Sequence, residues 1–211
     1  MLMLMKQPRW YLIGLCVLPA FGQPVVQVGR AFFRGSIVDY RVVNGRAVMQ
    51  GDIELGPVEL MSENWVPDSS ATKGGKDASY RTGTQFRWPN GVVPYTVDAD
   101  VPNPTRISDA MGIWSANTPI KFVARSNEAN YVRFIRQQNN GVCFSALGMT
   151  GGEQLVRVDD ACGSGALTHE IGHALGMYHE QARSDRDFYV AVDYSALDRR
   201  RFGDLNMSQP N

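Results

Sequence analysis

The chain has 211 residues, which suffices for one domain of ordinary size or for a smaller domain with processed segments. Lys and Arg together number 21, as do Asp and Glu, and no basic run stands out, so the charge gives no indication of a nucleic-acid partner. With 44% hydrophobic and 20% charged residues, the composition is that of a globular protein and excludes a disordered chain.

The N-terminus has the layout of a secretory signal peptide. Lys6 and Arg9 precede a short apolar run at residues 10–18, and small residues follow it. The run is too short for a transmembrane helix, so we expect cleavage after Gly22, secretion of the protein and no stable membrane anchor. The alternative is that residues 1–22 form an N-terminal segment of the core.

Residues 23 to about 78 differ in character from the rest of the chain. Residues 36–43 contain a β-like run, and Asn44-Gly45 directly after them predicts a hairpin turn. The stretch MQGDI at residues 49–53 comes next. Taken alone, its glycine-aspartate pair is more simply an ordinary turn than a functional motif.

Residues 67–84 predict an exposed linker. The segment is rich in Ser, Thr, Gly, Lys and Asp and poor in apolar residues, which makes it accessible to proteases. Its basic residues offer several cleavage points, and the sequence does not choose between them. We expect the mature protein to begin near Ala78 or Ser79.

The next part of the chain predicts an α+β fold. A helix begins near Pro104-Thr105, because apolar residues follow with the spacing i, i+3, i+4, i+7. Half-buried strands are predicted at residues 120–124, 131–136 and 154–158. With a second helix at the histidine motif described next, these elements predict a twisted, mostly parallel sheet backed by two helices.

The candidate metal site lies in the motif HEIGHALGMYHE. His169 and His173 are four residues apart, so on a helix they lie one turn apart on one face. Gly176 can adopt the left-handed conformation that ends a helix, which lets the chain turn back and bring in His179. Three neutral imidazoles suit a catalytic Zn²⁺ with an open fourth position, and Glu170 is placed to take a proton from water there.

The motif is more specific than its first half. A bare HExxH occurs by chance in roughly a few per cent of chains this long, and the alternative is an amphipathic helix with ordinary surface histidines. The glycine, third histidine and glutamate at fixed spacing make chance agreement negligible. The full string HExxHxxGxxHExxRxDRD resembles the signature of the astacin family of secreted zinc endopeptidases, with Met177 where the family usually has phenylalanine. RWPNGVVPY at residues 87–95 is similar to the strand that opens the family's catalytic domain.

The resemblance implies a fold, an activity and a cofactor. The fold would be the upper lobe of a metzincin, and the activity would be hydrolysis of protein or peptide substrates with one zinc ion per chain. It implies that His169, His173 and His179 bind the metal, that Glu170 is the general base, and that Glu180 helps to anchor the new N-terminus after activation. A different metzincin subfamily is disfavoured by that glutamate and by the RSDRD string after it.

The MQGDI stretch resembles the F-x-G-D-I motif of astacin-family propeptides, with Met49 in place of phenylalanine. In those propeptides the aspartate occupies the open zinc position, which implies that Asp52 blocks the metal here and that Gly51 permits the close approach. A zymogen of this kind has an activating protease among its partners. The implied division is a signal peptide at 1–22, a propeptide with an aspartate switch at 23–78 and a catalytic domain at 79–211.

The cysteines predict one disulfide. Loss of the signal peptide would remove Cys16 and leave two cysteines, an even count that suits one bridge in an oxidising compartment. In the family the pair that matches Cys143 and Cys162 is bridged, and such a bridge would stabilise the fold by ~3 kcal/mol. The family's other common disulfide is expected to be absent, because Pro119 stands where its first cysteine would be.

The sequence after Asp187 departs from the family pattern. Members of the family carry a C-terminal lobe with a Met-turn beneath the zinc and a tyrosine ligand, and neither finds a match before Asn211. We therefore expect the lower lobe to be largely missing from this chain. The alternative function is a zinc-binding homologue without catalysis, and the retention of Glu170 argues against it.

Overall fold

The structure is a computed structural model that describes residues 27–33, 36–61, 80–81, 83–138, 141–183 and 185–191. The predicted signal peptide, most of the predicted linker with its cleavage points, and residues 192–211 lie outside the described residues. None of the helices in the described ranges is both long enough and apolar enough to cross a membrane.

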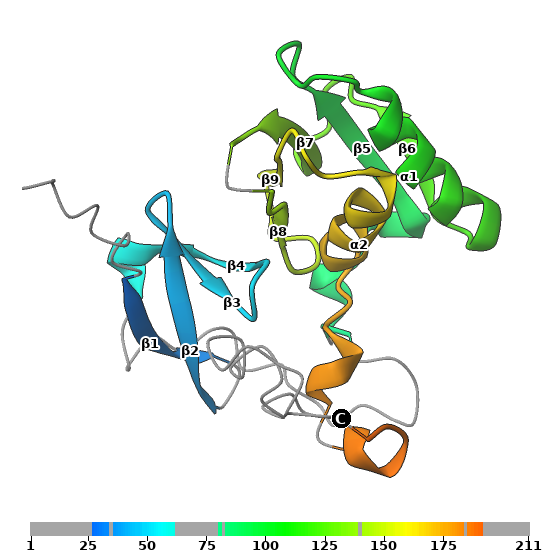
Figure 1. The fold of residues 1–211 in the computed structure, drawn as a ribbon. Helices are drawn as coiled ribbons and strands as arrows, with labels where there is room; N and C mark the ends of the chain where they lie inside the picture. Colours follow the sequence, from blue (N-terminus) through cyan, green and yellow to red (C-terminus); the bar gives the residue numbers. More distant parts are fainter. Residues whose placement is uncertain are drawn as a thin grey trace, which may run out of the picture.

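The described residues form one mixed sheet with two α-helices and several short 3-10 helices (Figure 1). The strand order in the sheet is β1-β2-β3-β4-β8-β9-β7-β5-β6. In chain order the elements are β1 (Val28–Phe33), β2 (Ser36–Val43), β3 (Arg46–Met49), β4 (Ile53–Pro57), η1 (Val58–Leu60), η2 (Thr84–Phe86), η3 (Pro89–Gly91), β5 (Val92–Val97), α1 (Thr105–Asn117), β6 (Lys121–Ala124), β7 (Tyr131–Arg136), β8 (Phe144–Ala146), β9 (Glu153–Val158), α2 (Ser164–Ala174), η4 (Glu180–Ala182) and η5 (Arg186–Phe188).

The sheet built by residues 92–158 is mainly parallel. Strands β6, β5, β7 and β9 pair in parallel, and only β8, at the edge of this part, is antiparallel to its neighbour β9. α1 begins at Thr105 and packs with α2 against this sheet, which confirms the predicted α+β class. The shared core is made of buried apolar side chains from both helices and from the alternating inward positions of the strands: Val93, Ile107, Met111, Val132, Phe134, Val156, Val158, Leu167 and Ile171.

The N-terminal strands extend this sheet instead of forming a separate layer. β1 to β4 form antiparallel pairs, and the predicted hairpin turn at Asn44-Gly45 joins β2 to β3 with both residues at positive φ (49° and 75°). β4 then lies parallel to β8, with Ile53 opposite Ser145. In Figure 1 the blue and cyan strands therefore continue into the edge of the part formed by residues 92–158.

Two tryptophans fix the position of α2. The indole Nε1 of Trp114 on α1 donates a hydrogen bond to the carbonyl of Thr168 at 2.9 Å, and that of Trp88 donates to the carbonyl of Ala174 at 2.9 Å. Gly172 permits the close approach of the helices, because a Cβ atom there would lie only 3.3 Å from the ring of Trp114. The first half of α2 and its last turn are thus each held by a donor from outside the helix.

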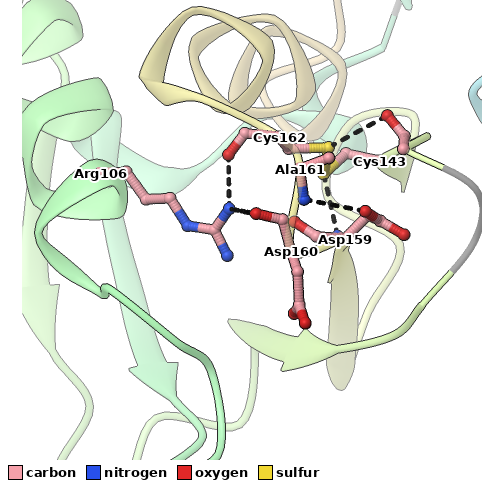
Figure 2. The surroundings of a disulfide bond; sticks show 7 residues. Arg106, Cys143, Asp159, Asp160, Ala161 and Cys162 are labelled. Carbon is pink, nitrogen blue, oxygen red and sulfur yellow. Dashed lines mark hydrogen bonds between the residues drawn. A yellow bond between two sulfur atoms is a disulfide. The ribbon is translucent and has the colours of Figure 1, made fainter.

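A disulfide and a buried arginine hold the loop that leads into α2. Cys143 and Cys162 are bridged in the structure, as the family resemblance implied. Arg106 of α1 is buried beside the bridge, and its Nη1 atom donates to the carbonyl oxygens of Asp159, Asp160 and Cys162 at 2.5–3.0 Å (Figure 2). The two N–H groups of one guanidinium nitrogen are therefore shared among three carbonyl groups immediately before the helix.

This arrangement predicts that Arg106→Gln destabilises the oxidised full-length chain by about 2–4 kcal/mol, since charge-assisted hydrogen bonds to buried carbonyl groups are lost. Urea denaturation followed by tryptophan fluorescence measures the change. The matched control, Arg125→Gln, removes an exposed guanidinium and should change the free energy of unfolding by about 0.5 kcal/mol or less. Equal urea midpoints for the two variants would contradict the role given to Arg106.

Candidate metal centre

Two of the three histidines in the chain stand on α2. His169 and His173 are one helical turn apart, so they share a face of the helix. The helix ends directly afterwards, where Gly176 has a φ of 107° and its N–H bonds to the carbonyl of His173 at 2.8 Å. This conformation favours glycine, and it turns the chain back so that His179 faces the other two rings.

The three imidazoles converge on one point together with a carboxylate. Nε2 of His179 lies 3.0 Å from Nε2 of His169 and 3.2 Å from Nε2 of His173. The carboxylate of Asp52 reaches the same point, with oxygen-to-Nε2 distances of 3.2, 3.5 and 3.0 Å to the three rings in chain order. One atom from each of the four residues could thus hold a single metal ion.

These distances fit a zinc ion. Zinc binds nitrogen and oxygen ligands at about 2.0–2.2 Å, and the corners of a tetrahedron of that size lie about 3.3–3.6 Å apart. The separations of 3.0–3.5 Å among the imidazole nitrogens and the carboxylate oxygens overlap the lower end of that range and extend slightly below it. Imidazole and carboxylate are also the ligand types that zinc commonly takes, so both the geometry and the chemistry of the cluster accept it.

The protonation of two rings follows from their neighbours. Nδ1 of His173 lies 2.7 Å from the carbonyl oxygen of Met177, so this nitrogen carries the proton and leaves the Nε2 lone pair free for a metal. Burial lowers the pKa of His173, which favours the same neutral form. Nδ1 of His179 lies 3.2 Å from the amide oxygen of Gln50 and donates to it in the same way.

Asp52 is placed by a tight turn between β3 and β4. Gln50 and Gly51 both have positive φ, 52° and 102°, and the carbonyl of Asp52 accepts a hydrogen bond from the N–H of Ser145 at 3.1 Å. Burial alone would raise the pKa of the Asp52 carboxyl, but its close contacts with the three imidazole rings hold it well below its usual range. The group is therefore an anion, as a metal ligand must be.

Glu170 is buried next to the cluster. Burial, and secondly the negative charge of Asp52, raise its pKa well above the usual value for a glutamate. Its Oε2 atom has no hydrogen-bond partner among the residues that the structure describes. A carboxyl group in this position is suited to accept and return a proton.

The predicted role of Glu180 depends on residues near Ser79. Glu180 stands on η4 with its carboxylate 3.3 Å from Nη1 of Arg183. The residues that would supply a new N-terminus near Ser79 are outside the described ranges, so the anchoring role of Glu180 stays a prediction.

The contact of Gln50 with His179 was not predicted from the sequence. No local pattern marks Gln50, because its partner His179 is 129 positions away.

Comparison with known proteins gives a consistent result. The model of the peptidase family Astacin matches residues 81–211. The chain is 37% identical over 147 residues to Zinc metalloproteinase nas-4 of Caenorhabditis elegans, which covers 68% of this chain and 44% of that protein. It is 33% identical over 150 residues to Astacin-like metalloprotease toxin 2 of Loxosceles intermedia, covering 70% of this chain and 52% of the toxin.

A solved structure shares the fold. High choriolytic enzyme 1, a hatching enzyme zinc-protease from Oryzias latipes, superposes with a TM-score of 0.55 and 30% sequence identity over 64% of this chain and 70% of that one. The chain thus spans about half of the length of the curated relatives named above.

The geometry predicts that His173→Ala lowers the zinc content of the full-length chain to a small fraction of one ion, because it removes a ligand held rigidly by a helix. Atomic absorption after dialysis against dilute chelator measures this. Glu180→Gln changes a nearby residue that is not a ligand and should keep the full zinc content. Equal zinc in His173→Ala and in the wild type would show that the cluster is not the metal site.

Proposed function

The chain belongs to the astacin family, and on that premise we propose that it is the zymogen of a secreted zinc endopeptidase. In this proposal residues 1–22 are a signal peptide, residues 23–78 an inhibitory prosegment and residues 79–211 the catalytic part. The observation that carries it is the contact of the Asp52 carboxylate with the three histidine Nε2 atoms.

His169, His173 and His179 hold the zinc in this proposal. Zinc bound there supplies a Lewis acid that lowers the pKa of a water molecule and polarises a carbonyl group. Glu170 takes the proton of the attacking water on a carboxylate oxygen and then delivers it to the leaving amine. Its burial supports this role, because a carboxyl with a raised pKa takes up a proton more readily than an exposed one.

The prosegment is inhibitory in two ways. Asp52 takes the position that a water molecule needs, and β4 takes the edge of β8, along which an extended peptide would pair. Both obstacles belong to one short segment around the turn between β3 and β4. Removal of that segment therefore frees the metal and the strand edge in one step.

Activation in this proposal is proteolytic. A partner protease cuts within the linker, and the new N-terminus is then anchored with the help of Glu180. The relatives that support the substrate class are proteases by name, a zinc metalloproteinase and a metalloprotease toxin, so we propose protein or peptide substrates.

Glu170→Gln tests the catalytic role. After limited proteolysis in the linker, the zinc-loaded variant should lose at least about 10²-fold in turnover of a quenched fluorescent peptide, because the general base is removed. Its zinc content should stay at the wild-type level. Glu128→Gln, a change in an exposed loop, is the matched control. Wild-type turnover in Glu170→Gln would reject the assignment, and zinc binding without turnover in the wild type would indicate a non-catalytic homologue.

Asp52→Ala tests the inhibitory contact. In the uncleaved, zinc-loaded chain this variant should bind a peptide hydroxamate at least about tenfold more tightly than the wild type, a gain of about 1.4 kcal/mol, since the inhibitor no longer competes with the carboxylate. Asp39→Ala changes an exposed aspartate on β2 and should leave the affinity unchanged. If both variants bind as the wild type does, Asp52 does not block the metal.

A further inference from the structure

A buried ion-pair cluster joins the N-terminal strands to β9. Glu54 on β4 accepts a hydrogen bond from Nε of Arg157 at 2.9 Å and one from Nε of Arg46 at 2.6 Å. The side chain of Glu54 is only 5% exposed, against 11% for Arg157 and 28% for Arg46. Two arginines thus share one buried carboxylate, and only Arg157 belongs to the proposed catalytic part.

Arg157 is held in place independently of Glu54. Its Nη1 atom donates to the side-chain oxygen of Gln137 at 2.9 Å, and its guanidinium lies 5.6 Å from the centre of the Phe144 ring. Both partners belong to the same part of the chain as Arg157. If β4 leaves, Arg46 and Glu54 leave together, and the guanidinium keeps its position but loses its carboxylate.

The position of Glu54 on β4 relates the cluster to the metal. Glu54 follows Asp52 by two residues and lies opposite Ala146 of β8. Its carboxylate reaches past this small side chain to Arg157 on the next strand, β9. An extended peptide laid along β8 with one residue at the metal would therefore bring a side chain about two residues away to the same guanidinium.

The uncleaved chain has a cavity beside the cluster, and the walls from β8 and β9 belong to the proposed catalytic part. A cavity of about 290 Å³ is lined by residues of β3, β4, β8 and β9, and it includes Glu54 and Arg157. The other carboxylate at its wall, Glu153, already has Arg133 within 3.4 Å, as well as Tyr131. A carboxylate that enters from a peptide is thus the natural replacement for Glu54 beside Arg157.

We propose that Arg157 forms a specificity subsite for an acidic side chain, glutamate or aspartate, about two residues from the peptide bond that is cut. Glu54 fills this subsite in the uncleaved chain and stands in for the substrate's carboxylate. The proposal rests on the proposed function as a zinc endopeptidase and names the substrate class of that same site. Its physical basis is that a guanidinium held in place by Gln137 can form charge-assisted hydrogen bonds with an entering carboxylate, as it does with Glu54.

The test uses the zinc-loaded enzyme after cleavage in the linker and pairs of quenched fluorescent peptides. In each pair a glutamate replaces a glutamine at one of the three positions on either side of the bond that is cut. The wild type should favour glutamate by about 10-fold or more in kcat/KM at a position two residues from that bond. Arg157→Gln should abolish this preference and still cut the glutamine peptides.

Two further variants separate a specific effect from a structural one. Arg157→Lys keeps the charge but not the planar donor pair, so it should retain part of the preference. Arg136→Gln, which removes an exposed ion pair on β7, should keep all of it. The proposal is overturned if the wild type has no preference for glutamate at any of these positions, or if Arg157→Gln keeps the wild-type ratio.

Failure of the proposed function has a different signature, which is that no peptide is cut by any variant. Binding of fluorescein-labelled glutamate and glutamine peptides to the same cleaved protein, measured by anisotropy, then decides the subsite. Tighter binding of a glutamate peptide that depends on Arg157 supports the subsite, and equal binding of both peptides overturns it.

Discussion

The contact between the Asp52 carboxylate and the three histidine Nε2 atoms is the interaction on which the rest of the structure depends. Each side of it is set by a backbone conformation that favours glycine. On one side Gly176 ends α2 and returns the chain to His179, and on the other Gly51 forms the turn that presents the aspartate. The candidate metal site is therefore built from two segments more than a hundred residues apart, and a zinc ion bound there would stabilise the arrangement in which they meet.

Three kinds of contact hold the segment around Asp52 against the part formed by residues 92–183. Met49 and Ile53 are buried with Leu147 and Tyr178, β4 pairs with β8, and Glu54 pairs with Arg157. All three involve residues within about five positions of Asp52. A single short segment therefore supplies the apolar contacts, the backbone hydrogen bonds and the ion pair of the interface. In our account one cut and one dissociation release the metal, the strand edge and the acidic-side-chain subsite together.

The features of the site and fold that depend on the spacing of nearby residues could be predicted from the sequence. Residues four apart on a helix share a face, so His169 and His173 could be placed before the structure was known, and the Asn44-Gly45 turn could be placed for a similar reason. The continuation of the sheet from β4 to β8 could not be predicted, because the alternation of residues in a strand does not indicate which other strand it pairs with. The Glu54–Arg157 pair, 103 positions apart, was hidden for the same reason. In the sequence, Arg157 is one of the polar residues of a strand in which polar and apolar residues alternate, and nothing distinguishes it from the others.

The most direct test of the central claim is an X-ray structure of the zinc-loaded, uncleaved chain with anomalous data collected at the zinc edge. Our account predicts one zinc peak at about 2.0–2.2 Å from the Nε2 atoms of His169, His173 and His179 and from a carboxylate oxygen of Asp52. A zinc ion bound by the three histidines and a water molecule, with the Asp52 carboxylate turned away, would contradict it.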